Sequence, residues 1–270
     1  TLPSTLIFDY PTARQLAGYF EDQAGHAGEA SADSIPQGSP DMPMPGASST
    51  ISARGLSCRL AGGESSALGL ANFVGANGDA VTEIPVARWI VDPAVVDNET
   101  ILKRTRYGAF MKDLELFDNA HFSVSPSEAA AMDPQQRMML ESSYEALHAS
   151  SISRVELLGS VTGMFVGIAA NDWADVIKGS PMARSVYAAT GSSHSIAAGR
   201  LPFVLGLQGP CCSYDTACSS TLAANHAAMR ALQLSECVNA VCVGVMQVLM
   251  PGVGITFATA GMTSPHGRCH

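Results

Sequence analysis

Two stretches of the chain are apolar almost without interruption, residues 160–170 and residues 236–249. Runs of this length that are bounded by small and polar residues are typical of strands buried on both faces. Between them, residues 209–218 predict a short strand and a turn of small residues, and residues 219–234 predict an amphipathic helix. The order strand, turn, helix, strand predicts a parallel βαβ unit.

A helical spacing of apolar side chains, including Met138 and Leu147, marks residues 134–148. Asp133 is predicted to be the N-cap of this helix, and Pro134 suits its first position because the proline nitrogen has no hydrogen to donate. We interpret this segment as a structural helix.

Weaker patterns fill the rest of this part of the chain. Residues 51–60 predict a first strand and a loop, although serine and arginine interrupt the apolar pattern of the strand, and residues 68–77 predict a short helix. Residues 171–180 predict a loop, and a further helix is expected to begin within residues 189–200. Together these elements predict an α/β domain that starts near residue 50.

The first part of the chain has a different pattern. Residues 1–20 combine an apolar entry with a turn and a short helix, and they are too few to form a core alone. Residues 21–49 are rich in glycine, alanine, serine and proline, which predicts a flexible linker. The large domain then occupies residues 50–270. A start without methionine and an end just after a turn favour a piece of a longer protein.

Composition narrows the class of protein. Of the 270 residues, 47% are hydrophobic and 14% are charged, which favours a folded α/β core over a disordered chain. The net charge of −9 gives no reason to expect nucleic acid as a partner. The sequence contains no long apolar run that predicts a membrane span, and its first residues lack the pattern of a secretory signal.

The seven cysteines are odd in number and irregular in spacing, and none belongs to a CxxC pair. We therefore expect neither a disulfide framework nor a bound metal ion, and reduced thiols favour an intracellular, cytoplasmic location.

One cysteine, Cys218, falls where the predicted turn becomes a helix. The first amides of a helix carry partial positive charge, which favours the thiolate, the nucleophilic form of cysteine. Small neighbours let a carbonyl group approach, and free backbone N–H groups could hold a developing oxyanion. The sequence therefore predicts a nucleophile elbow for acyl transfer, with Cys218 as its catalytic residue. Inert packing is the alternative, because cysteine is among the most buried residue types.

Three short motifs resemble one family. Asp215-Thr-Ala-Cys-Ser-Ser220 resembles the active-site signature of the β-ketoacyl synthases, the condensing domains of polyketide and fatty acid synthases. Met132-Asp-Pro-Gln-Gln-Arg137 and residues 257–269 resemble two further signatures of that family. The resemblance covers about residues 50–270 and implies the N-terminal half of a ketosynthase. The fold implied is α/β and thiolase-like, with α-β-α-β-α layers, and the domain is expected to form a homodimer.

Residues 1–20 resemble the last loop and helix of a phosphopantetheine acyl carrier domain. The serine that holds the 4′-phosphopantetheine arm in that family lies upstream of the match. We therefore expect no cofactor on this chain, and we expect acyl carrier domains as its partners. A carrier followed by a ketosynthase is the order found in modular polyketide synthases.

The resemblance implies an acyltransferase that performs decarboxylative Claisen condensation through an acyl thioester on Cys218. The family draws its two catalytic histidines from positions far downstream of the cysteine. His194 is therefore not implied as a base, His226 is expected to be a buried core residue, and the 270 residues alone are not expected to complete the reaction. Two alternatives stay open: a thiolase-like enzyme acting on coenzyme A thioesters, and a non-catalytic ketosynthase-like scaffold. The sequence also leaves open whether the product is a polyketide or a fatty acid.

Overall fold

A computed structural model describes residues 50–93, 96 and 98–268. The carrier-like segment predicted at residues 1–20 and the linker predicted at residues 21–49 lie outside the described residues. The described part of the chain falls within one compact unit, Pro45–His270.

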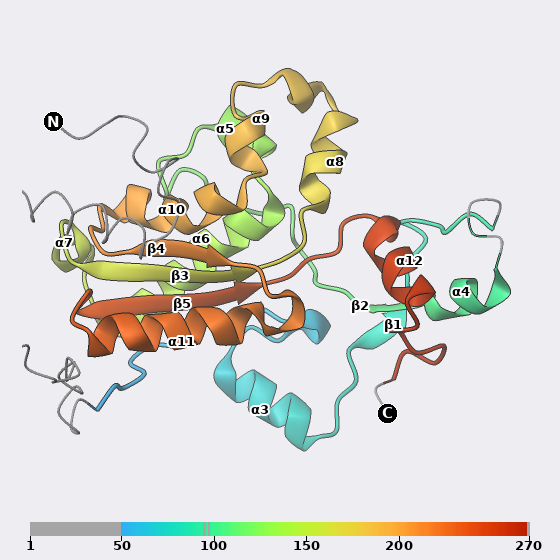
Figure 1. Cartoon of the computed structure of the whole chain (residues 1–270), viewed down its shortest axis with the longest axis horizontal. Helices are drawn as coiled ribbons and strands as arrows, with labels where there is room; N and C mark the ends of the chain where they lie inside the picture. The colour runs from blue at the N-terminus through green and yellow to red at the C-terminus, as the bar shows by residue number, and fades with distance from the viewer. Residues whose placement is uncertain (1–49, 94–95, 97, 269–270) are drawn as a thin grey trace, which may run out of the picture. The chain divides into compact units, whose positions relative to one another are not determined.

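A parallel three-stranded sheet forms the centre of this unit (Figure 1). Strand β3 (Thr162–Ile168) lies between β4 (Cys211–Tyr214) and β5 (Asn239–Val245), and both neighbours run parallel to it. All seven residues of β3 are buried, as expected for an apolar strand between two layers of helices. The predicted strands and the parallel βαβ unit are confirmed, with β3 inserted between the two strands that the elbow and its helix connect.

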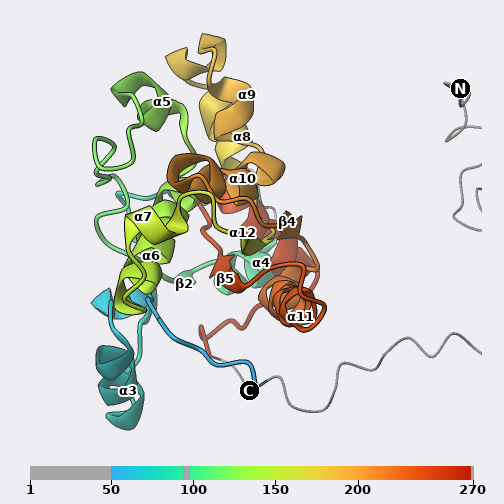
Figure 2. The same ribbon diagram turned by 90° about the vertical axis from the view of Figure 1, so that its left-hand side faces the viewer.

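Helices cover both faces of the sheet (Figure 2). Helix α11 (Ser220–Gln233) packs on one face, whereas α10 (His194–Leu205) and α6 (Pro134–Ala149) pack on the other. Successive side chains of a strand point to opposite faces, so β3 contributes to the core on both sides. The resulting helix–sheet–helix layering confirms the predicted α/β class.

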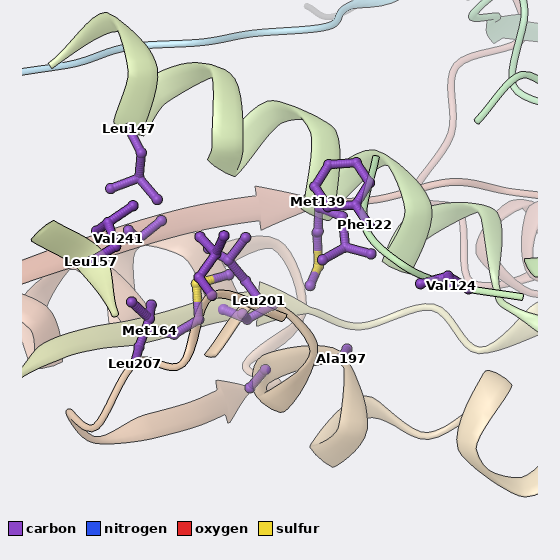
Figure 3. Packing of buried hydrophobic residues seen from close by; sticks show 14 of the residues in the cluster. Phe122, Val124, Met139, Leu147, Leu157, Met164, Ala197, Leu201, Leu207 and Val241 are labelled. Carbon is purple, nitrogen blue, oxygen red and sulfur yellow. The ribbon is translucent and has the colours of Figure 1, made fainter. Parts of the chain in front are cut away.

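The larger core cluster lies on the α6 and α10 side (Figure 3). Met164 of β3 and Val241 of β5 meet Met139 and Leu147 of α6, and Leu201 of α10 closes the cluster from the other helix. Burial of large apolar side chains is the main favourable term in folding. This cluster therefore fixes the two helices to the sheet.

The smaller cluster lies beneath α11. Phe165 of β3 packs with Ala224, Ala228 and Ala231, whose spacing of four and three residues puts them on one helical face. Alanine keeps this face flat, so α11 lies close to the sheet.

The structural helix predicted at residues 134–148 is confirmed as α6. The Asp133 carboxylate accepts a hydrogen bond from the Gln135 N–H at 2.8 Å, and Pro134 occupies the first turn. The helix predicted at residues 68–77 is also confirmed, as α3 (Ala67–Gly75), with the Ser66 hydroxyl as its cap.

The strand predicted within residues 51–60 does not form, so that part of the prediction was wrong. These ten residues, all within the described part of the chain, form no helix or strand. Their polar side chains bind α6 instead: Ser57 Oγ donates to Glu145 at 2.7 Å, and Arg59 pairs with Glu141 at 3.0 Å. The segment satisfies its polar groups at a helix surface, which its serine and arginine content favours over a sheet.

The loop predicted at residues 171–180 was also wrong, because it contains helix α8 (Asp172–Lys178). Long-range contacts stabilise this short helix. The Asp172 carboxylate accepts the N–H groups of Leu249 and Met250 at 3.0 and 3.2 Å, and the Trp173 indole donates to the Ala131 carbonyl at 2.9 Å. Tertiary contacts of this kind override weak local propensity.

The helix expected to begin within residues 189–200 is confirmed as α10. The remaining elements are shorter and surround this framework. They are η1 (Ala61–Gly63), β1 (Val81–Glu83), α4 (Glu99–Arg104), β2 (Tyr107–Ala109), α5 (Pro126–Ala131), α7 (Arg154–Leu157), η2 (Pro181–Arg184), α9 (Ala188–Gly191), η3 (Ala217–Ser219) and α12 (Pro251–Thr259). Strands β1 and β2 form an antiparallel pair, and α12 packs on α4.

Candidate active site

The turn between β4 and α11 holds the candidate nucleophile. Element η3 is a single 3₁₀ turn, and α11 begins at Ser220 directly after it. Cys218 lies in the middle of η3 and is exposed. The predicted strand–turn–helix arrangement is therefore confirmed. We call residues 215–220 the elbow.

Short polar side chains hold the elbow together. The Asp215 carboxylate accepts the Ala217 N–H at 3.1 Å, and the Ser219 hydroxyl donates to the Thr216 carbonyl at 2.8 Å. The Ser220 hydroxyl accepts the Thr216 N–H at 2.9 Å and donates to the Ala217 carbonyl at 2.7 Å. Side-chain bonds to nearby backbone groups stabilise tight turns in place of regular structure. The residues beside Cys218 are thus fixed by local hydrogen bonds.

Two glycines let the start of α11 press against the sheet. A Cβ atom at Gly167 of β3 would lie 2.5 Å from the Thr221 nitrogen, and one at Gly244 of β5 would overlap the Thr221 side chain. The two glycines are paired across the sheet. Sequence reasoning did not single out this pair. A glycine inside each apolar strand was the available signal, because glycine there often marks close approach of another backbone.

The arrangement suits attack on a carbonyl carbon. The first N–H groups of a helix have no intrahelical acceptor and carry partial positive charge. Ser219, the N-cap of α11, makes no side-chain hydrogen bond to these groups within the described chain. An exposed thiol beside such groups can form a bond to an acyl carbon while the amides stabilise the developing oxyanion.

Among the described residues, neither His194 nor His226 makes a hydrogen bond to the elbow. His194 begins α10, is half-buried, and has Nε2 at 3.1 Å from the Ala170 carbonyl oxygen. His226 lies on α11 and is exposed, so the expectation of a buried core histidine was wrong. Position 226 falls on the side of α11 opposite the alanines that face the sheet, which explains its exposure.

A buried polar cluster surrounds the start of α6. Gln135 donates from Nε2 to the Ala170 carbonyl at 2.9 Å and accepts the Gln247 N–H at 3.1 Å. The Asp133 N–H donates to the Gly191 carbonyl at 2.9 Å. Burial raises the pKa of the Asp133 carboxyl, and hydrogen bonds from Gln135 oppose this shift. The cluster ties α6 to α9 and to the loop after β3, which supports the structural interpretation of this motif.

The other cysteines divide by exposure. Cys237 is buried beneath α11, and burial raises the pKa of its thiol. Cys242 on β5 is exposed, although desolvation by neighbouring atoms still raises the pKa of its thiol. Cys211 and Cys212 on β4 are exposed. Within the ranges that the structure describes, three or more metal-binding side chains do not come together, and no helix there has the length and apolarity to cross a membrane.

An open pocket of about 370 Å³ lies beside α4 and is not lined by the elbow. Its wall includes Trp89 and several charged side chains. These charges pair with each other, because Lys103 binds Glu99 at 2.8 Å and Arg106 binds Glu83 at 2.7 Å. The pocket therefore offers a ligand little unpaired charge.

Solved structures place this fold in the class of ketosynthase domains, which are condensing enzymes with a thiolase-like α/β fold. The ketosynthase from module 6 of the bacillaene synthase from Bacillus subtilis 168 matches 80% of this chain with a TM-score of 0.68 and 32% sequence identity. The oxazolomycin ketosynthase domain from Streptomyces albus JA3453 matches 80% of it with a TM-score of 0.68 and 30% identity. The chain covers 34% and 38% of these two solved chains.

Sequence comparison gives the family. The family described as beta-ketoacyl synthase, N-terminal domain, matches residues 48–270, and the chain belongs to this family. Polyketide synthase GfsB from Streptomyces halstedii is 38% identical over 99% of this chain, and erythronolide synthase EryA3 from Saccharopolyspora erythraea is 37% identical over 98% of it. The chain spans 5% and 8% of the lengths of these two relatives.

Proposed function

We propose that Cys218 is the acyl-accepting nucleophile of a ketosynthase that works in a modular polyketide synthase. The observation that carries this proposal is the exposed Cys218 thiol at the start of the 14-residue helix α11. In the first step, the Cys218 sulfur attacks the thioester carbonyl of an acyl chain on a carrier domain. The new carbon–sulfur bond forms as the old one breaks, and the carrier thiol leaves with a proton.

Condensation follows on the acyl-cysteine. A malonyl-type thioester on a carrier loses carbon dioxide, which leaves an electron pair on its α-carbon. That carbon attacks the carbonyl of the Cys218 thioester, a carbon–carbon bond forms, and the Cys218 thiolate is released. The product is a β-ketoacyl chain on the carrier, ready for further processing. The polyketide synthases that resemble this chain favour a polyketide product over a fatty acid.

Acyl carrier domains are the proposed partners. The similarity to GfsB covers 99% of this chain and so extends into the first 49 residues. This extent supports residues 1–20 as the end of a carrier domain, residues 21–49 as a linker, and residues 50–270 as ketosynthase. The 4′-phosphopantetheine arm belongs to the carrier and reaches the elbow as part of the substrate.

A homodimer is also proposed, through the free edge of β4. In the described sheet, β4 is bonded to a strand on one side only, and Cys211 and Cys212 are exposed. The neighbouring helix α10 exposes 88% of Phe203. A free strand edge pairs readily with a second copy of itself about a twofold axis. The Phe203→Glu variant should then shift the protein from dimer to monomer in light scattering, whereas an unchanged mass would contradict this interface.

The test of the acyl-transfer proposal compares two donors. The protein, with its native flanking sequence, is incubated with the same acyl group on a carrier domain or on coenzyme A, and acylation of Cys218 is followed by mass spectrometry. We expect faster acylation from the carrier. Cys218→Ala should abolish it, and Cys211→Ala, which removes another exposed thiol, should not. Faster transfer from coenzyme A would favour a thiolase-like enzyme, and no transfer from either donor would favour a scaffold.

A further inference from the structure

The residue before Cys218 has an unusual backbone conformation. Ala217 adopts φ +56°, in the left-handed region. An L-residue with a Cβ atom pays about 1–2 kcal/mol for this conformation, because the Cβ approaches a carbonyl oxygen. Such a conformation persists only where surrounding contacts hold it, and it is frequent at functional sites.

Among the elbow side chains that bind the backbone around Ala217, the Ser220 hydroxyl is the buried one, whereas Asp215 and Ser219 are exposed. Ser220 is 5% exposed, and its Oγ accepts the Thr216 N–H at 2.9 Å while donating to the Ala217 carbonyl at 2.7 Å. The Ser220 N–H also donates to the Ala217 carbonyl. One side chain thus binds the peptide group that follows the left-handed residue and the peptide group between Asp215 and Thr216.

Ser220 itself is anchored to the sheet. It is the first residue of α11, and a Cβ atom at Gly167 would lie 2.7 Å from the Ser220 carbonyl carbon. Its backbone therefore lies directly against β3, all of whose residues are buried. The hydroxyl transmits this fixed position to the turn that carries Cys218.

We infer that Ser220 is a positioning residue for Cys218. Its hydroxyl helps to hold Ala217 in the left-handed conformation, so that the Cys218 thiol stays exposed beside the first amides of α11. This inference rests on the proposed role of Cys218 as acyl acceptor. Ser220 acts through the backbone and contacts no substrate.

The first test removes the hydroxyl and then the strain that it holds. Ser220→Ala should slow acylation of Cys218 from the carrier donor about tenfold, the effect of about 1.4 kcal/mol. Adding Ala217→Gly should recover most of that loss, because glycine adopts the left-handed region without the Cβ penalty. The matched control is Ser143→Ala, at a buried α6 hydroxyl that makes no hydrogen bond within the described chain, and it should change the rate less than about twofold.

The second readout is alkylation of Cys218 by iodoacetamide, which needs no acyl donor. A merely structural role for the hydroxyl predicts slowing that Ala217→Gly does not reverse, and this result would overturn the inference, as would an unchanged rate in Ser220→Ala. If Ser220→Ala does not fold, Ala217→Val gives an independent test. A β-branched residue tolerates the left-handed region poorly, so alkylation should slow with the Ser220 hydroxyl still present.

The two proposals fail in different ways. Without any acylation of wild-type Cys218, the proposed function is wrong, yet the alkylation rates still decide the role of Ser220. With normal acylation in Ser220→Ala, the positioning role is wrong while the function of Cys218 stands.

Discussion

Helix α11 lies so close to Gly167 that a side chain at this position should force the helix away from the sheet. In Gly167→Ala, the new Cβ atom would lie 2.5 Å from the Thr221 nitrogen and 2.7 Å from the Ser220 carbonyl carbon. These are main-chain atoms and cannot rotate away, so α11 must move from the sheet. Overpacking of this kind costs roughly 1–3 kcal/mol, and we expect about 3 kcal/mol here. Acylation of Cys218 should fall as well, because the helix carries the elbow with it.

Gly244→Ala provides the contrasting case. Its new Cβ atom would overlap the Thr221 hydroxyl and lie 2.8 Å from Thr221 Cγ2, both of which are side-chain atoms. We expect a loss of about 2 kcal/mol, of which Thr221→Ala should restore about half by removing those atoms. The same Thr221→Ala change should not rescue Gly167→Ala, because the main-chain clash remains.

Urea unfolding followed by circular dichroism measures these differences through the midpoint and slope of each variant. The matched control is Gly199→Ala on α10, where an added Cβ atom would meet nothing within 4 Å. Alanine favours a helix interior over glycine, so this control should gain about 0.5–1 kcal/mol. If Gly167→Ala unfolded at the same urea concentration as the wild type, or if Thr221→Ala rescued it, the close approach of α11 to the sheet would be refuted.

Three further outcomes are expected. Leu140→Ala, at a fully buried site on α6, should lower the free energy of unfolding in urea by about 2–5 kcal/mol. Burial raises the folded-state pKa of Asp133 above its ordinary value of 3.8, so the protonated form favours folding and that contribution is lost as pH rises through the folded-state pKa. The wild type should therefore lose stability relative to Asp133→Asn from about pH 4 upward, and a pH-independent difference in urea midpoints would count against this. Cys237, whose pKa burial raises, should react with a thiol reagent much more slowly than exposed Cys211 in the folded protein; equal rates would show that Cys237 is not packed beneath α11.

The strands and the helix around the elbow could be predicted from the sequence. Apolar runs predicted β3 and β5, and the N-cap Asp133 with Pro134 predicted α6, because these signals depend on local chemistry and strong periodicity. The turn that holds Cys218 was also predicted, from its small residues between a strand and an amphipathic helix.

Long-range contacts account for what the sequence did not reveal. Helix α8 depends on Asp172 and Trp173 meeting partners far along the chain, and residues 51–60 bind the surface of α6 instead of pairing with a strand. The left-handed conformation of Ala217 and the Ser220 hydroxyl that holds it also depend on exact placement in space. None of these leaves a periodic signal in the sequence.

The most direct test of the central claim is to map the acyl group after brief incubation of the protein, with its native flanking sequence, with an acyl-carrier thioester. Peptide mass spectrometry locates the added mass. Our account predicts acylation on Cys218 alone among the exposed cysteines, and its loss in Cys218→Ala while Cys211→Ala and Cys212→Ala remain acylated. An acyl group on another cysteine, or an unmodified Cys218 in a folded protein, would contradict the assignment of the elbow as the acyl-accepting site.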